Sequence, residues 1–117
     1  MDDDFDAIVG RLRAICLGFP GTSEKLSHGE PAFFVAGRQF ANLDNHHHGS
    51  PWLAVWCAAA DGAQQTLIES RPERFFRPPY VGHRGWVAMR LENDVDWDEV
   101  AWILGDAVAL ISVKRRR

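Results

Sequence analysis

The sequence predicts an α+β fold in which one antiparallel sheet carries the N- and C-terminal helices on the same face. Three observations support this prediction: an amphipathic helical pattern at each end, consecutive strand patterns joined by short turns, and a length of 117 residues. Consecutive strands with short connections pair antiparallel, and two amphipathic helices need an apolar surface, which one sheet face supplies. The length suits a single domain over residues 1–117. The expected architecture is therefore a two-layer sandwich.

The first element is a helix. Apolar residues recur at helical spacing from Phe5 to Cys16, with charged residues between them, and predict an amphipathic helix from about Asp4 to Leu17. The leading aspartates suit the positive end of this helix. The sequence Gly18-Phe19-Pro20-Gly21 then ends it.

Strand patterns follow this helix. The first is a short edge strand that ends at Gly29 and Pro31. Two apolar runs flank the turn Ala36-Gly37-Arg38, and this arrangement predicts a β-hairpin. A polar loop from Asn45 to Pro51 separates the hairpin from a further strand. The expected strands cover residues 24–28, 33–35, 40–43, 52–57 and 86–91.

The remaining elements are helical or irregular. Asp61 is expected to cap a short helix that ends near Ser70. Residues 72–79 are too rich in proline for a sheet, so a turn of helix followed by a loop is expected there. Asp96 opens the final helix, and Glu99 is spaced from it as in a capping box. The apolar face of that helix comprises Trp97, Val100, Ala101, Leu104, Ala107, Val108 and Ile111.

Charge is distributed unevenly along the chain. The net charge is −3, yet residues 71–90 contain five arginines and one glutamate, which gives +4. The tail Lys114-Arg115-Arg116-Arg117 adds a further +4, so the rest of the chain carries −11. Such asymmetry points to a polyanion partner for one surface, although a solvated charged face is the commoner explanation.

Compartment is indicated by the cysteines and the N-terminus. Cys16 and Cys57 lie far apart within apolar stretches, as expected of small core residues in a reducing compartment. The acidic start differs from a cationic signal peptide, and no apolar run approaches the roughly 18 residues that a membrane helix needs. We therefore expect a cytoplasmic protein with no membrane partner.

Two segments of the chain resemble the MmcQ/YjbR family. The first runs from His28 through Val35 and continues over Gly37 to Ala41. The second, Pro72 to Val87, is more specific because it combines a Pro-Pro-Tyr element with Gly and Gly-Trp elements. With Asp96-Trp97 at the start of the last helix, the resemblance covers nearly the whole chain.

This resemblance implies a compact α+β sandwich similar to the frataxin/CyaY-like fold, also described as a double-wing arrangement. It also implies DNA binding, because the family customarily carries that label. The chain departs from expectation in its negative net charge and in its His46-His47-His48 loop.

Positive and aromatic side chains gather in the second segment. Its arginines and histidine can contact phosphates, and the rings of Tyr80 and Trp86 offer flat faces for stacking on bases. In the alternative, structural interpretation, Pro78-Pro79 and two glycines fix the backbone path and Trp86 belongs to the core. The candidate nucleic-acid- or anion-binding residues are Arg74, Arg77, Tyr80, His83, Arg84, Lys114, Arg115 and Arg116.

Metal and catalytic sites are not indicated. His46, His47 and His48 are adjacent, whereas ligands on one strand face alternate and ligand pairs on a helix are three or four residues apart. His28 and His83 lack an acid–base partner that the sequence reveals. No nucleophile elbow and no glycine-rich phosphate loop is present. We therefore expect no metal, no cofactor and no enzymatic activity.

These observations predict a small binding module, and DNA is its leading candidate ligand. The alternatives are a protein-interaction or regulatory adaptor and a binder of a small anionic metabolite that uses the same arginines. Geometry separates the three hypotheses. Nucleic acid requires a continuous basic stripe, a metabolite a pocket of roughly a few hundred Å³, and an adaptor a contiguous exposed apolar patch.

Overall fold

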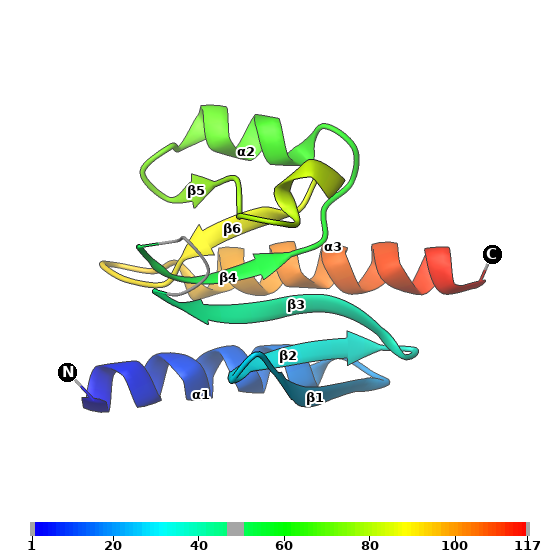
Figure 1. Cartoon of the computed structure of the whole chain (residues 1–117), viewed down its shortest axis with the longest axis horizontal. Helices are drawn as coiled ribbons and strands as arrows, with labels where there is room; N and C mark the ends of the chain where they lie inside the picture. Colours follow the sequence, from blue (N-terminus) through cyan, green and yellow to red (C-terminus); the bar gives the residue numbers. More distant parts are fainter. Residues whose placement is uncertain (1, 47–50, 117) are drawn as a thin grey trace.

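A computed structural model describes residues 2–46 and 51–116 of the chain. Within them, six strands form one antiparallel sheet in the order β1-β2-β3-β4-β6-β5, and α1 and α3 cover one of its faces (Figure 1). The predicted two-layer α+β sandwich is confirmed. The elements are α1 (Asp2–Gly18), β1 (Thr22–Ser27), β2 (Glu30–Val35), β3 (Arg38–Asn45), β4 (Leu53–Cys57), α2 (Ala63–Ser70), β5 (Phe75–Phe76), the 3₁₀ turn η1 (Gly82–Arg84), β6 (Val87–Arg90) and α3 (Trp97–Arg116).

The core lies between the two terminal helices and the sheet. Leu12 and Cys16 of α1 are fully buried, and so are Leu104 and Ala107 of α3, which belong to the apolar face that the sequence predicts. The helical periodicity of both ends is therefore confirmed, because the apolar stripe of each helix is the side that packs on the sheet. No helix within the described ranges is long and apolar enough to cross a membrane.

The β2–β3 hairpin ends in a two-residue turn. Ala36 and Gly37 both adopt left-handed backbone angles, with φ of 52° and 79°, which is the conformation of a type I′ turn. The predicted hairpin is confirmed, and β3 begins at Arg38, directly after the turn. The turn therefore fixes Arg38 at one end of the sheet.

Two local predictions were wrong. Residues 72–79 were expected to avoid the sheet, but Phe75 and Phe76 pair with β6 as a two-residue edge strand. The prolines flank this pair, so they remove none of its backbone donors. Asp61 was expected to cap α2, but the cap is Gly62, which makes no side-chain hydrogen bond. Its φ of 84° is a conformation that glycine adopts without strain.

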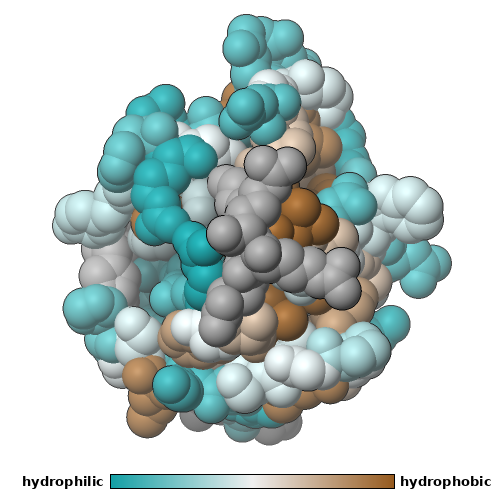
Figure 2. Space-filling view, turned by 90° about the vertical axis from the view of Figure 1, so that its right-hand side faces the viewer, coloured by the Kyte–Doolittle hydropathy of each residue, from teal (hydrophilic) through white to brown (hydrophobic). Residues whose placement is uncertain are grey.

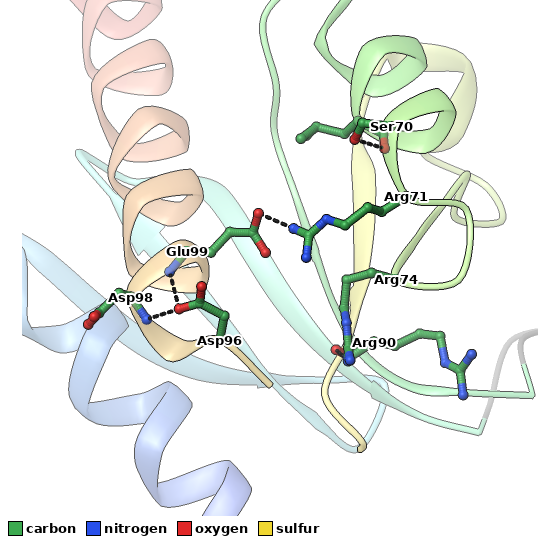
Figure 3. Close-up of polar contacts among 8 residues, drawn as sticks. Ser70, Arg71, Arg74, Arg90, Asp96, Asp98 and Glu99 are labelled. Atoms are coloured by element: carbon green, nitrogen blue, oxygen red, sulfur yellow. Dashed lines mark hydrogen bonds and ion pairs between the residues drawn. The ribbon is translucent and has the colours of Figure 1, made fainter. Parts of the chain in front are cut away.

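The start of α3 is capped by Asp96 as predicted, but the reciprocal bond from Glu99 is replaced by another contact. The Asp96 carboxylate accepts hydrogen bonds from the backbone N–H groups of Asp98 and Glu99, each at 3.1 Å. In the reciprocal half of a capping box, Glu99 would turn back to Asp96. Here its carboxylate instead forms an ion pair with Arg71, which ties α3 to the segment after α2 (Figure 3).

The two cysteines are expected to be unreactive in the folded protein. Both are fully buried, and burial raises the pKa of the Cys57 thiol to about 12 from 9.0 and raises that of Cys16 as well. Because only the thiolate reacts, alkylation at neutral pH should follow unfolding. Stability should also fall as the pH rises from 9.0 towards about 12, since the unfolded chain releases thiol protons that the folded chain retains.

Mass spectrometry after iodoacetamide treatment, with and without urea, tests the thiol prediction. We expect two adducts in urea and none in native buffer over the same time. Alkylation of either cysteine in native buffer at the rate of a free thiol would contradict it.

Candidate functional site

The segment between β5 and β6 places three of the candidate side chains on the surface. Arg77, His83 and Arg84 are all exposed, and the last two belong to η1. The Arg77 side chain crosses Gly82 so closely that a Cβ there would lie 2.5 Å from its Cγ. Only glycine at position 82 leaves room for the Arg77 side chain to lie against η1 in this way.

Trp86 lies beneath this group rather than on the surface. It is 4% exposed, and the Arg84 guanidinium carbon lies 5.4 Å from the centre of its ring. Gly85, with a φ of 86°, ends η1 and directs the chain into β6. Because its ring is buried, Trp86 belongs to the core, as the structural interpretation expected, and supports Arg84 from below.

Arg38 is a functional candidate that the sequence did not single out. It is exposed at the start of β3 and lines, together with Arg84, a hollow of about 200 Å³ whose wall includes Trp86 and Ile111. The two arginines are 46 positions apart in the sequence, and only the β2–β3 turn brings Arg38 to this end of the sheet. A local sequence pattern therefore carried no signal for it.

The basic tail leaves α3 at the same end of the molecule. Ile111 lines the hollow beside Arg38 and Arg84, and the backbone of Lys114, Arg115 and Arg116 continues α3 by about one turn beyond it. The side chains of these three residues and all of Arg117 lie outside the described part of the structure. We refer to Arg38, Arg77, His83, Arg84 and the last turn of α3 as the basic end.

Charge is separated along the long axis of the fold. The segments that meet at the basic end, residues 31–43, 74–91 and 107–117, contain no acidic residue. At the opposite end, Asp4 of α1 and Glu92 and Asp94 of the β6–α3 loop line one broad cavity. Figure 2 views the basic end and shows strongly hydrophilic residues on one side of it and apolar residues on the other. The basic end thus combines positive residues from segments that carry no acidic residue.

Arg74 does not belong to the basic end. Its guanidinium donates hydrogen bonds to the backbone carbonyls of Arg90 at 2.9 Å, Glu92 at 2.8 Å and Asn93 at 2.6 Å. Figure 3 shows its side chain directed at Arg90 in β6. Since its donors hold the β6–α3 loop, Arg74 is a structural residue, and the structure separates it from the other candidate arginines.

Tyr80 stands beside the basic end, at the rim of a second hollow. It is 71% exposed and has a φ of 67°, which is rare for a bulky residue. This hollow, of about 350 Å³, lies on the sheet face away from α1 and α3 and is walled by Trp56, Glu30 and Asn42. Gln39 and Val81 line both hollows, so Tyr80 and the basic end adjoin.

His46 contacts the loop that follows β3 and the loop that follows β6. Nδ1 of His46 lies 3.0 Å from the Pro51 carbonyl oxygen, and its Nε2 lies 4.0 Å from the Glu92 carboxylate. His47 and His48 lie outside the described residues. Within residues 2–46 and 51–116, no group of three or more histidine, cysteine, aspartate or glutamate side chains is arranged to hold a metal ion.

Comparison with known proteins gives a family and a fold. A family model described as YjbR matches residues 17–109. No curated protein matches the chain. A solved structure, Deinococcus radiodurans protein DR2400 with a DUF419 domain, is similar with a TM-score of 0.75 and 18% sequence identity. The match covers 89% of this chain and 78% of that one, and at this identity it shows the fold alone.

Proposed function

Because the chain belongs to the YjbR family, whose membership assigns it a fold and no reaction, we propose its function from its surface. We propose that it binds nucleic acid, with the basic end contacting phosphates. Arginine side chains are well suited to phosphate oxygens, which supply most of the affinity in sequence-independent binding. Tyr80, exposed in the same segment as Arg84, adds a ring on which an unpaired base can stack.

The separation of charge along the molecule carries this proposal. With a net charge of −3, a uniform distribution would repel a polyanion from every side. Because the segments that form the basic end carry no acidic residue, this end keeps a positive potential, and the charge separation orients the protein as it approaches. Arg38, Arg84 and the last turn of α3 come from three different elements, so the basic surface is wider than one loop.

The alternatives fare differently. The hollow beside Tyr80 is large enough for a metabolite, but Glu30 lies in its wall, and no arginine or lysine occurs among the described residues that line it. It therefore does not favour a small anion. An adaptor is favoured by one observation, an exposed apolar groove between α2 and α3. That groove lies on a different part of the surface from the basic end.

Removing Arg38 and Arg84 together is expected to weaken nucleic-acid binding and its dependence on salt. Each phosphate contact contributes about 0.9 to the slope of log affinity against log salt concentration on duplex DNA. The double variant Arg38→Gln/Arg84→Gln should therefore lower the slope by roughly 2. Fluorescence anisotropy of labelled duplex and single-stranded DNA at about 20, 50 and 150 mM salt measures both quantities.

A second double variant, Arg11→Gln/Lys25→Gln, is the matched control. It removes the same charge from exposed residues elsewhere, and each of these cations also stacks on a ring, as Arg84 does. The control should bind nearly as well as the parent. Absence of binding at the lowest salt, or equal losses in the two double variants, would refute the proposal.

A further inference from the structure

An apolar groove separates α2 from α3 on the helical side of the molecule. Its volume is about 640 Å³, and small residues that precede and begin α2 form part of its wall. Two large apolar side chains of α3 stand out into solvent along it, Trp102 at 75% exposure and Val113 at 53%. Exposed tryptophan is uncommon on a monomer, and a contiguous apolar patch around one marks an interaction surface.

The exposed side of α3 has the spacing of a helix–helix seam. Four exposed residues that line the groove follow one another at intervals of four, three and four, which is the spacing of a coiled-coil contact stripe. They are Trp102, Asp106, Ala109 and Val113. This stripe spans about 16 Å, or three turns, and it is separate from the stripe that packs on the sheet. α3 thus presents a second contact face outward.

Charge along α3 is arranged so that the helix complements a reversed copy of itself. The helix starts at the acidic end of the molecule, with Asp98 and Glu99 in its first turn, and finishes at the basic end with Lys114 to Arg116. Between residues 97 and 113 it has no lysine or arginine. An antiparallel copy therefore brings each basic terminus towards an acidic one, and the helix dipoles also align favourably.

We propose that a second copy of this chain occupies the groove, with its α3 antiparallel to the first α3 across a two-fold axis. The stripe is centred near Asp106 and Ala109, close to the middle of the helix, so a two-fold axis there makes the surface self-complementary. Trp102 of each copy then lies against the Val113 end of the other. The groove is also lined by Ala58, Ala59 and Ala60, whose small side chains leave room for a large ring.

Two substitutions, one at Asp106 and one at Trp102, should change pairing in opposite directions. It is the acidic residue in the groove lining, and the two-fold axis brings the two Asp106 carboxylates close together. Like charges at a seam oppose pairing, so Asp106→Asn should strengthen the pair several-fold. Trp102→Gln removes the largest exposed apolar side chain of the stripe and should weaken pairing by roughly tenfold or more.

Sedimentation velocity from low to high micromolar protein tests the pairing. We expect the parent chain to shift from one to two copies, the shift to move to lower concentration in Asp106→Asn, and Trp102→Gln to remain a single copy. Arg38→Gln/Arg84→Gln should pair like the parent, because no described residue lines both the groove and the basic hollow.

Three results would overturn the proposal. If the parent chain is a single copy at every concentration, a second copy does not occupy the groove. Pairing that survives Trp102→Gln places the contact elsewhere. Pairing that is lost in Arg38→Gln/Arg84→Gln indicates an end-to-end contact between opposite charges. Because Trp102 is exposed, its variant should keep the melting temperature of a folded chain, which circular dichroism checks.

Discussion

Trp86→Ala is expected to destabilise the domain by about 3–5 kcal/mol, the usual cost of truncating a buried aromatic side chain. The ring is 4% exposed and lies where β6 begins, between the sheet and the Arg84 side chain. Removing it leaves a cavity beside Ile111 of α3, which lines the same hollow. Since domains of this size are stable by about 5–15 kcal/mol, the loss is a large share of the total.

Thermal and urea unfolding followed by circular dichroism measure this loss. Trp102→Ala is the matched control, because it removes the same side chain from a position that is 75% exposed. At low protein concentration it should change stability by less than about 0.5 kcal/mol. Trp86→Phe, which keeps most of the apolar volume, should fall between the two. If Trp86→Ala melted within a few degrees of the parent, the ring would contribute little to the core.

The parts of the fold that could be predicted are those in which one local pattern determines the structure. The stripe ending at Cys16 can be buried only if the first helix packs on the sheet, and the Ala36-Gly37 turn permits only a tight hairpin. Both are found. The errors occurred where two local signals compete. In the sequence, the prolines around Phe75 argue against a strand, yet that residue pairs with Met89. Asp61 has the side chain of a better helix cap than Gly62, yet Gly62 is the cap.

The candidate site was harder to predict, because the sequence gives the position of each arginine in the chain but not the groups that surround its side chain after folding. Arg74, Arg77 and Arg84 look alike in the chain, yet Arg74 lies beside three backbone carbonyls and the others face solvent. Arg38 has no charged neighbour in the sequence and lines a hollow with Arg84 only because of the hairpin. Segregation of charge to the two ends is likewise a property of the topology.

This topology also explains how an acidic protein can present a basic surface. The chain crosses the sheet so that the β2–β3 turn, η1 and the end of α3 meet at one end (Figure 1). The start of α1 and the β6–α3 loop meet at the other, where Arg71 pairs with Glu99 and Arg74 binds the loop carbonyls. Arg90 of the same segment is also engaged there, donating a hydrogen bond to the Glu73 carbonyl at 3.1 Å. Three of the five arginines in residues 71–90 are thus used away from the basic end, which leaves Arg77 and Arg84 to it.

Arg74→Ala is expected to cost about 2–4 kcal/mol of stability, because hydrogen bonds from a charged group contribute about 1.5–3 kcal/mol each and are not additive. The three carbonyls that it holds belong to Arg90, Glu92 and Asn93. Two residues of this loop, Asn93 and Asp94, have left-handed backbone angles, with φ of 62° and 60°. Such a conformation costs energy in residues other than glycine, so the surrounding contacts must maintain it. Without the guanidinium, the β6–α3 loop loses the contacts that keep it in this conformation.

The comparison with Arg77→Ala separates this structural role from phosphate binding. Arg77 is exposed three residues further along the chain, so its removal should change stability by less than about 0.5 kcal/mol while lowering the salt slope of DNA binding by roughly 0.9. Arg74→Ala should do the reverse, with lower stability and an unchanged slope in the folded fraction. Arg74→Lys should recover little stability, because one ammonium cannot reproduce the planar fork that reaches three carbonyls. Urea unfolding and anisotropy on the same samples decide the matter: a stable Arg74→Ala protein with a reduced salt slope would return Arg74 to the phosphate-binding residues.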